Sequence, residues 1–353
     1  MMKQAEILHW LKEKDPTQLR LLYAEADRIR EKHVGNAIHF RGLIEFSNIC
    51  HRSCWYCGIR YQNAHIERYR MSRQQILDAA RRAVELNFGT IVLQSGEDPD
   101  LDTDDFCQTI RTIKKETNLA ITLSVGERSF DELAKFKIAG ADRYLLRFET
   151  SNTELYRKIH PPLPSRPNYD RFEILLQLNE LGYEVGSGIM VGIPGSTWDD
   201  ILEDLHLFQT LPIDMIGIGP YIPHPSTPLA KVAGEDSSDE NQPPNTSETA
   251  LKVLALTRIL CPDTNLPSTT ALETSDPEKG YENGLLCGAN VIMPNITDMH
   301  YRKLYDIYPG KAGQARPAKD LLERIHKSLE HIGRVPGTGP GLAPRFVHRT
   351  FER

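Results

Sequence analysis

The chain has 353 residues, of which 40% are hydrophobic and 25% charged, a composition that fits one large globular domain or two ordinary ones and excludes collagen-like and disordered classes. Its net charge of −6 argues against a general nucleic-acid binder, which needs a basic surface to neutralise phosphates. Because residues 1–16 lack the apolar segment of a signal peptide and no run of about 18 apolar residues occurs, we expect a cytoplasmic protein without a membrane span.

Two helices are expected at the N-terminus, over residues 5–14 and 17–33, and Pro16 suits the first turn of the second one. From Gly35 onward, short β-rich runs alternate with helical patterns. The expected strands cover residues 42–47, 90–94, 120–124, 143–148, 184–191, 215–219, 266–271 and 290–293. The expected helices that follow them cover residues 72–86, 103–115, 130–139, 152–159, 171–181, 198–209, 248–260 and 278–287, with an acidic loop within 220–244.

Strands that are each followed by a helix predict an α/β fold in which eight parallel strands close into a TIM-type (βα)8 barrel; an open doubly wound sheet is the alternative. We expect an N-terminal helical extension over residues 1–35 and the barrel over residues 36–311. Residues 312–353 comprise a covering helix over 318–332 and a basic, Gly/Pro-rich tail to which we assign no function. The turns after the strands, where a barrel carries its active site, are polar and Gly-rich.

Three of the six cysteines, Cys50, Cys54 and Cys57, lie within eight residues, directly after the first expected strand. This C-x3-C-x2-C spacing suits a 4Fe–4S cube, because three thiolates hold three irons and leave the fourth iron open for chemistry. The alternative is a zinc site completed by His51 or His65, although structural zinc usually has two separated ligand pairs and no second pair is present. The remaining cysteines, which are scattered in apolar or helical patterns and are interpreted as buried thiols, are Cys107, Cys261 and Cys287.

An aromatic residue, Tyr56, stands directly before the third cysteine, and the motif resembles the signature of the radical S-adenosylmethionine (SAM) superfamily. The resemblance implies one 4Fe–4S cluster whose open iron binds SAM, and reductive cleavage of SAM to methionine and a 5′-deoxyadenosyl radical. It also implies that Tyr56 lies near the SAM adenine and that Ser95, Gly96 and Glu97, after the second strand, contact the SAM amino group.

Longer segments resemble one branch of this superfamily, the HydE maturases of FeFe-hydrogenase; IVLQSGEDP and GIGPYIPHPSTPLA are the most specific of them. Two residues apart on a strand, Arg147 and Glu149 are expected to point the same way. For Arg143 an ion pair at the bottom of the barrel is the alternative to a site role, and for Met190 it is core packing. The resemblance implies that SAM is bound by Glu149, Arg171 and Thr122, with Met190 and Tyr301 as weaker candidates, and that an anionic substrate lies near Arg143, Arg147, Thr269 and Tyr305.

The same resemblance implies a small, anionic, sulfur-containing organometallic substrate, an iron–carbonyl–cyanide–cysteine complex made by another maturase during assembly of the H-cluster. It implies other hydrogenase maturases and an electron donor as partners, with no nucleic acid and no membrane. Some members of the branch carry a second cluster on cysteines after a Tyr-Pro-Gly segment; here residues 308–310 are followed by KAGQARPAKD, so no second cluster is expected there. One alternative is a radical SAM mutase that acts on lysine, like methylornithine synthase; biotin synthase is a further relation. The alternative from a different class is a non-catalytic iron–sulfur carrier scaffold.

Overall fold

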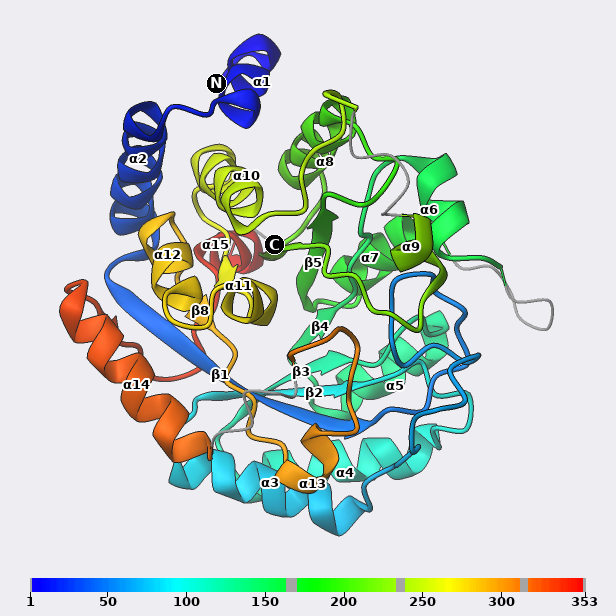
Figure 1. Ribbon diagram of the computed structural model, residues 1–353. Helices are drawn as coiled ribbons and strands as arrows, with labels where there is room; N and C mark the ends of the chain where they lie inside the picture. The colour runs from blue at the N-terminus through cyan, green and yellow to red at the C-terminus, as the bar shows by residue number, and fades with distance from the viewer. Residues whose placement is uncertain (1, 163–169, 233–238, 312–316, 352–353) are drawn as a thin grey trace.

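The computed structural model describes residues 2–162, 170–232, 239–311 and 317–351. Within them, eight parallel strands form a closed barrel surrounded by helices (Figure 1). The strands pair in the order β2–β3–β4–β5–β6–β7–β8–β1, and β1 also pairs with β2, which closes the ring. The TIM-type barrel is therefore confirmed, and the open doubly wound sheet is wrong. The strands are β1 (Ala37–Ser47), β2 (Thr90–Ser95), β3 (Ala120–Ser124), β4 (Arg143–Leu145), β5 (Glu184–Val191), β6 (Met215–Pro220), β7 (Pro267–Ser268) and β8 (Val291–Ile292).

The helices of the barrel begin where the sequence supplies capping side chains. Ser72, Ser129 and Thr197 each cap a helix and form a reciprocal capping box with the residue three positions further on. The N-terminal helices pack against the outer helices α8 and α10 (Figure 1). The helices are α1 (Gln4–Lys12), α2 (Pro16–Val34), α3 (Arg73–Glu85), α4 (Thr103–Glu116), α5 (Phe130–Ala139), α6 (Thr153–Ile159), α7 (Arg171–Glu180), α8 (Trp198–Thr210), α9 (Pro228–Val232), α10 (Ser247–Leu260), α11 (Thr270–Ser275), α12 (Gly280–Leu286), α13 (Met299–Arg302), α14 (Ala318–His331) and α15 (Pro344–Phe351).

Some strands are shorter than the sequence predicts. The strand expected over 266–271 is limited to β7, because Thr269 takes the extended N-cap conformation from which α11 starts. The strand expected over 143–148 ends at Leu145. Two segments named in the sequence analysis lie partly outside the described residues. They are residues 233–238 of the expected acidic loop and residues 312–316 of the segment in which no second cluster is expected. None of the helices in the described ranges combines the length and apolar character needed to cross a bilayer.

Glycines in β5 and β6 leave space inside the barrel. A Cβ on Gly188 would lie 2.0 Å from the carbonyl oxygen of Gly217, so only glycine lets these two strands approach as they do. On β6, Gly217 and Gly219 line an internal cavity that larger side chains would fill. The small residues of these two strands therefore determine how much room the barrel offers to a ligand.

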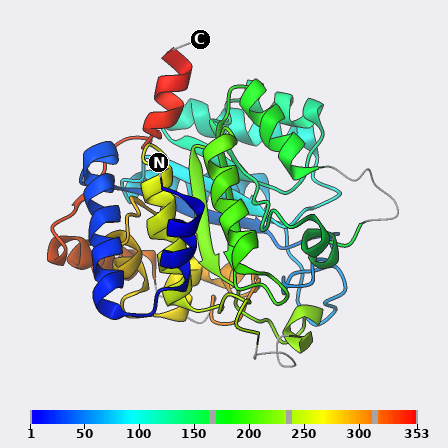
Figure 2. The same ribbon diagram turned by 90° about the horizontal axis from the view of Figure 1, so that it is seen from above.

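The opposite end of the barrel, at the N-terminal ends of the strands, is closed by the C-terminal tail. After α14, the short strand β9 (Val335–Pro336) pairs with β1. The Arg143 guanidinium donates to the Pro340 carbonyl oxygen (2.8 Å), and the Arg41 guanidinium donates to that of Gly341 (3.2 Å). Figure 2 shows the tail continuing into α15, which lies at the end of the barrel away from α9.

The position of Arg143 corrects one prediction. Arg143 is the first residue of β4, is buried at the closed end, and forms an ion pair with Glu184 on β5. It does not line the internal cavity, so its expected substrate role is wrong, and the alternative of a buried ion pair at the bottom of the barrel is correct.

Asp204, buried on α8, provides a test of how the fold responds to pH. Burial raises the pKa of Asp204 to about 7, although its carboxylate accepts a hydrogen bond from the Ser151 N–H at 2.6 Å. The unfolded value is about 4. Because the folded state disfavours the ionised form, this residue's contribution to stability is fully present below about pH 4 and falls as the pH rises to about 7.

The variant Asp204→Asn keeps an oxygen acceptor without the charge. We therefore expect its stability not to fall between about pH 4 and pH 7 for this reason. Its melting temperature should exceed that of the wild type by several degrees at about pH 8, and the difference should be smaller at about pH 5. Differential scanning calorimetry of both proteins at the two pH values measures this. If the difference in melting temperature between the two proteins does not grow with pH, the buried Asp204 ionises without a loss of stability.

Candidate active site

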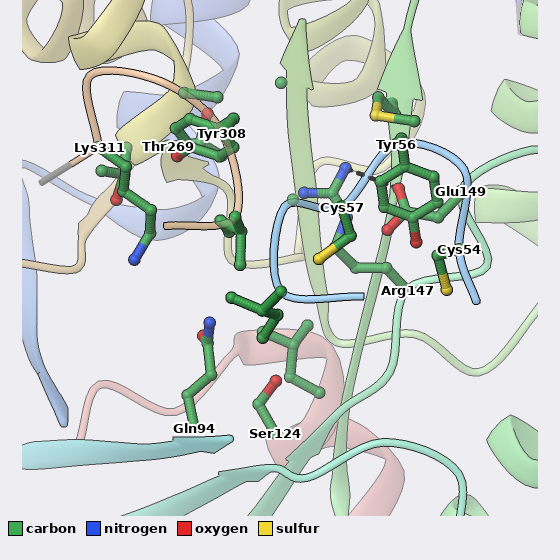
Figure 3. A pocket seen from close by; sticks show the side chains of 18 of the residues that line it. Cys54, Tyr56, Cys57, Gln94, Ser124, Arg147, Glu149, Thr269, Tyr308 and Lys311 are labelled. Atoms are coloured by element: carbon green, nitrogen blue, oxygen red, sulfur yellow. Dashed lines mark ion pairs between the residues drawn. The ribbon is translucent and has the colours of Figure 1, made fainter. Parts of the chain in front are cut away.

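A cavity of about 320 Å³ lies inside the barrel, at the C-terminal ends of the strands (Figure 3). It is lined by the loop after β1, by residues at the ends of the other strands and by the segment that follows α13. Enzymes with this fold carry their active sites at this end. The volume suits small molecules rather than a polymer.

The three cysteines of the motif all line this cavity. Main-chain hydrogen bonds fix the loop that carries them: the Trp55 N–H donates to the Ile159 carbonyl oxygen (2.9 Å) and the Gly58 N–H to that of Ile307 (2.9 Å). Burial, together with the nearby Cys54 and Glu97, raises the pKa of Cys50 to about 12. A thiol in such a place ionises readily only beside positive charge, which a bound metal cluster provides.

The alternative zinc site would need a histidine beside the three cysteines. Among the described residues, no group of three or more His, Cys, Asp and Glu side chains is placed to hold a metal ion together. His65 is exposed, and His51 Nε2 lies 3.2 Å from Glu97 Oε1, so neither histidine completes the alternative zinc site. In a 4Fe–4S cube each thiolate binds a different iron, so the three sulfurs need not converge on one point.

The segment after β2 packs directly against the cysteine loop. A Cβ on Gly96 would lie 2.3 Å from the Ile49 carbonyl oxygen and 2.8 Å from the Cys50 Cβ, so this position requires glycine. Ser95 and Glu97 on either side line the cavity. The buried Glu97 carboxylate accepts a hydrogen bond from the Glu127 N–H (2.9 Å). Burial alone would raise the pKa of Glu97, but the contact with His51 and the charge of Arg52 outweigh it and lower the pKa.

Arg147 and Glu149 lie together on the cavity wall after β4 (Figure 3). Arg147 Nη2 is 3.0 Å from Glu149 Oε2. The backbone of Glu149 has a φ of 68°, in the left-handed region that residues other than glycine rarely adopt. Its backbone is held there by a hydrogen bond from the Glu149 N–H to the Gly188 carbonyl oxygen (3.0 Å). Strain of this kind collects at functional sites, where the surrounding structure fixes a side chain in place.

Arg171, the first residue of α7, reaches the cavity but is already paired. Its Nε donates to Glu127 Oε1 (2.9 Å), and its Nη1 donates to the Arg147 carbonyl oxygen. Glu127 also accepts from Arg52 Nη1 (3.3 Å), so one carboxylate connects α7 to the cysteine loop. The sequence analysis missed Glu127 and Arg52. For Glu127 the signal in the sequence is its place just after the third strand, next to Gly126, which lines the cavity.

Tyr56 also lines the cavity, and a buried histidine fixes its hydroxyl group. The Tyr56 hydroxyl and His160 Nε2 are 2.8 Å apart. Burial lowers the pKa of His160 well below its ordinary value, so its ring is neutral and forms this hydrogen bond without a charge. Tyr156 stacks on the other side of His160, with ring centroids 4.3 Å apart.

Two expected cofactor residues lie elsewhere. Tyr301 stacks on Tyr69 with ring centroids 4.7 Å apart, and its hydroxyl accepts from Gln75 on α3 (2.8 Å). It is absent from the cavity wall, because α13 ends at Arg302 and does not place Tyr301 and Tyr305 on one helical face. Thr122 is buried one strand layer below the cavity and does not line it either. The structure therefore does not bring Tyr301 and Thr122 to the cavity wall with the other expected residues.

The remaining expected residues, Met190, Thr269 and Tyr305, do line the cavity, as does Met293. Thr269 Oγ1 donates to the Ile218 carbonyl oxygen (3.0 Å), and the Tyr305 hydroxyl accepts from Gln94 Nε2 (3.2 Å). The sequence analysis also missed other polar residues of this wall, among them Gln94, Ser124, Tyr308 and Lys311. Gln94 and Ser124 stand at the ends of their strands, which is a usable signal, whereas Lys311 follows a loop whose course the sequence does not predict.

Comparison with known proteins places this geometry in context. Residues 44–208 match the sequence profile of the radical SAM superfamily. The FeFe hydrogenase maturase subunit HydE of Thermotoga maritima is 47% identical over 316 residues, which cover 90% of this chain and 86% of that protein. A 3-methylornithine synthase of Methanosarcina acetivorans is 29% identical over 343 residues, which cover 95% of this chain and 89% of that protein. The crystal structure of methylornithine synthase (PylB) has the same fold, with a TM-score of 0.82 and 24% identity over 96% of this chain and 94% of that one.

A closed parallel barrel with three motif cysteines at its active-site end, matched by the superfamily profile, defines a radical SAM enzyme. Radical SAM enzymes bind a 4Fe–4S cluster and SAM. The close similarity to the Thermotoga maritima protein across nine-tenths of the sequence is more specific. The chain belongs to the HydE family of FeFe-hydrogenase maturases.

Proposed function

We propose that this enzyme holds SAM between the cysteine loop and Glu149, and that it uses the resulting radical to convert an anionic, sulfur-containing iron–carbonyl–cyanide–cysteine complex during H-cluster assembly. The observation that carries the proposal is that Cys50, Cys54 and Cys57 share one cavity with Glu149 and Glu97. These groups are what a sulfonium amino acid needs: an open iron for its amino and carboxylate groups, and carboxylates for its positive charges.

When bound by Cys50, Cys54 and Cys57, the cluster supplies an open iron position and the electron that splits the sulfonium bond of SAM. The protein's own side chains position the nucleotide. Glu97 and the peptide around Gly96 face the SAM amino group, and Tyr56, fixed by His160, borders the adenine. Among the described residues, Glu127 and a main-chain carbonyl engage Nε and Nη1 of Arg171, and its Nη2 group is assigned to the SAM carboxylate.

The cavity walls protect the radical and receive the substrate. Apolar groups such as Met190 and Met293 alternate with a few polar ones, which limits water beside the reacting atoms. Arg147, Thr269 and Tyr305 present a guanidinium and hydroxyl groups to an anionic substrate. We further propose that the substrate arrives from another hydrogenase maturase, that an electron donor reduces the cluster, and that this takes place in the cytoplasm.

The variant Glu149→Gln tests the SAM site. We expect it to bind SAM at least about tenfold more weakly than the wild type, because a buried carboxylate opposite a cation contributes more than about 1.4 kcal/mol. The assay reconstitutes the cluster without oxygen, adds dithionite and SAM, and quantifies 5′-deoxyadenosine over a range of SAM concentrations. Glu154→Gln, an exposed carboxylate on α6, is the matched control and should behave as the wild type.

The outcomes separate the candidate functions. A wild-type protein with a fully loaded cluster that forms no 5′-deoxyadenosine would defeat the proposal and support a carrier scaffold. Consumption of lysine would support a mutase like the 3-methylornithine synthases, which align over most of this chain. Restored hydrogenase activity in a strain that lacks its HydE would support the maturase function.

A further inference from the structure

The loop that carries the motif cysteines has an inner side and an outer side. Cys54 lines the cavity and is buried. The preceding residue, Ser53, is partly exposed, and its hydroxyl group accepts a hydrogen bond from Nε2 of the exposed Gln62 (2.7 Å). One step along the chain therefore leads from the protein surface to a cysteine of the proposed cluster site, and an electron that enters from outside has a short route there.

The segment over residues 60–68 packs on the outer side of this loop. The Tyr61 N–H donates to the Arg52 carbonyl oxygen (2.8 Å), and Arg60 Nη2 donates to the Ser53 carbonyl oxygen (3.3 Å). The backbone of Tyr61 is thus fixed against the cysteine loop, whereas its side chain is 68% exposed. Tyrosine and arginine are the residue types that dominate the binding energy of protein–protein interfaces.

Helix α6 lies beside the cysteine loop and extends the same surface (Figure 1). The hydrogen bond from the Trp55 N–H to the Ile159 carbonyl oxygen joins the loop to the last residue of this helix. Arg157 and Lys158, in the last turn of α6, are both exposed. Residues 60–68 and 153–158 together are called the outer face below.

The outer face is cationic, although the protein as a whole has a net charge of −6. Its acidic residues are Glu67 and Glu154, and its cationic residues are Arg60, Arg68, Arg157 and Lys158. Within the described ranges, none of the four cations forms an ion pair, and the two arginines of the first segment donate to neutral oxygen atoms. A local excess of positive charge attracts an acidic partner and speeds its docking.

We propose that the outer face is the docking surface for the protein that reduces the cluster, and that this partner is a small, acidic one-electron carrier. In each docking event the carrier loses one electron and the cluster gains it, and no atom or proton is transferred. The inference rests on the proposed function for the need for an electron. The docking surface itself is defined by Arg60, Tyr61, Arg157 and Lys158.

Flavodoxin, a small acidic protein that carries flavin mononucleotide, is the probe. Reduced flavodoxin is the sole electron source for the cluster-loaded enzyme with SAM, and 5′-deoxyadenosine is quantified over a range of flavodoxin concentrations. The double variant Arg157→Glu/Lys158→Glu should need at least about tenfold more flavodoxin for its half-maximal rate, because two attractive charges become repulsive. Its rate with dithionite, a small reductant that needs no docking surface, should equal that of the wild type.

The matched control makes the same change of net charge elsewhere. Lys319 and Lys327 are exposed on α14, which lies across the barrel from α6 (Figure 1). Lys319→Glu/Lys327→Glu should therefore need the same flavodoxin concentration as the wild type. Added salt should slow the flavodoxin-driven reaction of the wild type more than that of Arg157→Glu/Lys158→Glu, because it screens an attraction that this variant lacks.

A second pair of variants covers the case in which the double charge reversal does not fold, which the dithionite rate reveals. Arg157→Gln/Lys158→Gln removes the charges without reversing them, and Tyr61→Ala removes the exposed ring. Each should need at least about threefold more flavodoxin than the wild type.

Three results would overturn the proposal: equal flavodoxin requirements of the wild type and the outer-face variants, an equally strong loss in the α14 control, or a wild type that cleaves SAM with dithionite but not with reduced flavodoxin. A wild type that is inactive with both reductants contradicts the proposed function instead. Isothermal titration calorimetry with oxidised flavodoxin then decides this inference. Binding at least about tenfold weaker in Arg157→Glu/Lys158→Glu would leave it standing, and equal binding would refute it.

Discussion

Replacing Cys54 by alanine is expected to abolish both the 4Fe–4S cluster and the cleavage of SAM. Cys54 is buried on the cavity wall between the other two motif cysteines, and a cube held by only two thiolates has two exposed corners instead of one. We expect the iron and sulfide content to fall to a small fraction of the wild-type value and 5′-deoxyadenosine to become undetectable, a loss of at least about a thousandfold.

The control for this prediction is another buried cysteine. Cys107 lies on α4 in the hydrophobic core and lines no part of the cavity. Cys107→Ala should keep the cluster and SAM cleavage at a stability cost of about 1 kcal/mol. A fully loaded, active Cys54→Ala protein would show that these cysteines are not the cluster ligands. Iron and sulfide analysis and electron paramagnetic resonance of the reduced protein distinguish the results.

Replacing Glu184 by glutamine is expected to destabilise the closed end of the barrel more than any surface substitution. Glu184 is buried, pairs with Arg143, and lies 3.7 Å from Arg41. Burial and the charge of Arg143 already lower the pKa of Arg41 to about 9, so these two arginines depend on their shared carboxylate. Removing its charge leaves buried cations uncompensated, at a cost of about 3–5 kcal/mol.

Thermal or urea unfolding of Glu184→Gln measures this loss. Glu116→Gln is the matched control, because Glu116 forms its ion pair with Arg81 at the surface. An exposed pair contributes about 0–1 kcal/mol, so the control should unfold close to the wild type. Equal stability of the two variants would mean that hydrogen bonds from the tail and from Asn265, rather than charge, hold this layer together.

The features of the fold that the sequence could predict are those encoded by neighbouring residues. Alternating apolar runs predicted the helices and the longer strands, and three cysteines in eight residues identified a loop that lines the cavity. Arg147 and Glu149 were expected on one side of a strand. They do face one cavity, although the strand stops at Leu145 and Glu149 reaches the wall through a left-handed backbone.

The features that could not be predicted depend on contacts between distant segments. Glu127 and Arg171 are 44 positions apart, and Lys311 and Glu45 are 266 positions apart, so no local pattern joins either pair. Arg143 was given a substrate role by the family resemblance, although its position at the start of the expected strand over residues 143–148 already fitted the closed end of the barrel. The tail was given no function because its glycines and prolines act through their main-chain carbonyl groups, which every residue has.

The tail also bears on how the protein matures in the cell. Residues 340–343 supply acceptors and a donor to Arg41, Arg143 and Glu184, all of which leave the ribosome much earlier. A nascent chain can thus assemble its ring of strands yet hold an unfinished ionic layer at one end until residues 340–343 have left the ribosome. We expect chains stalled on the ribosome before residue 340 has emerged to remain sensitive to proteases.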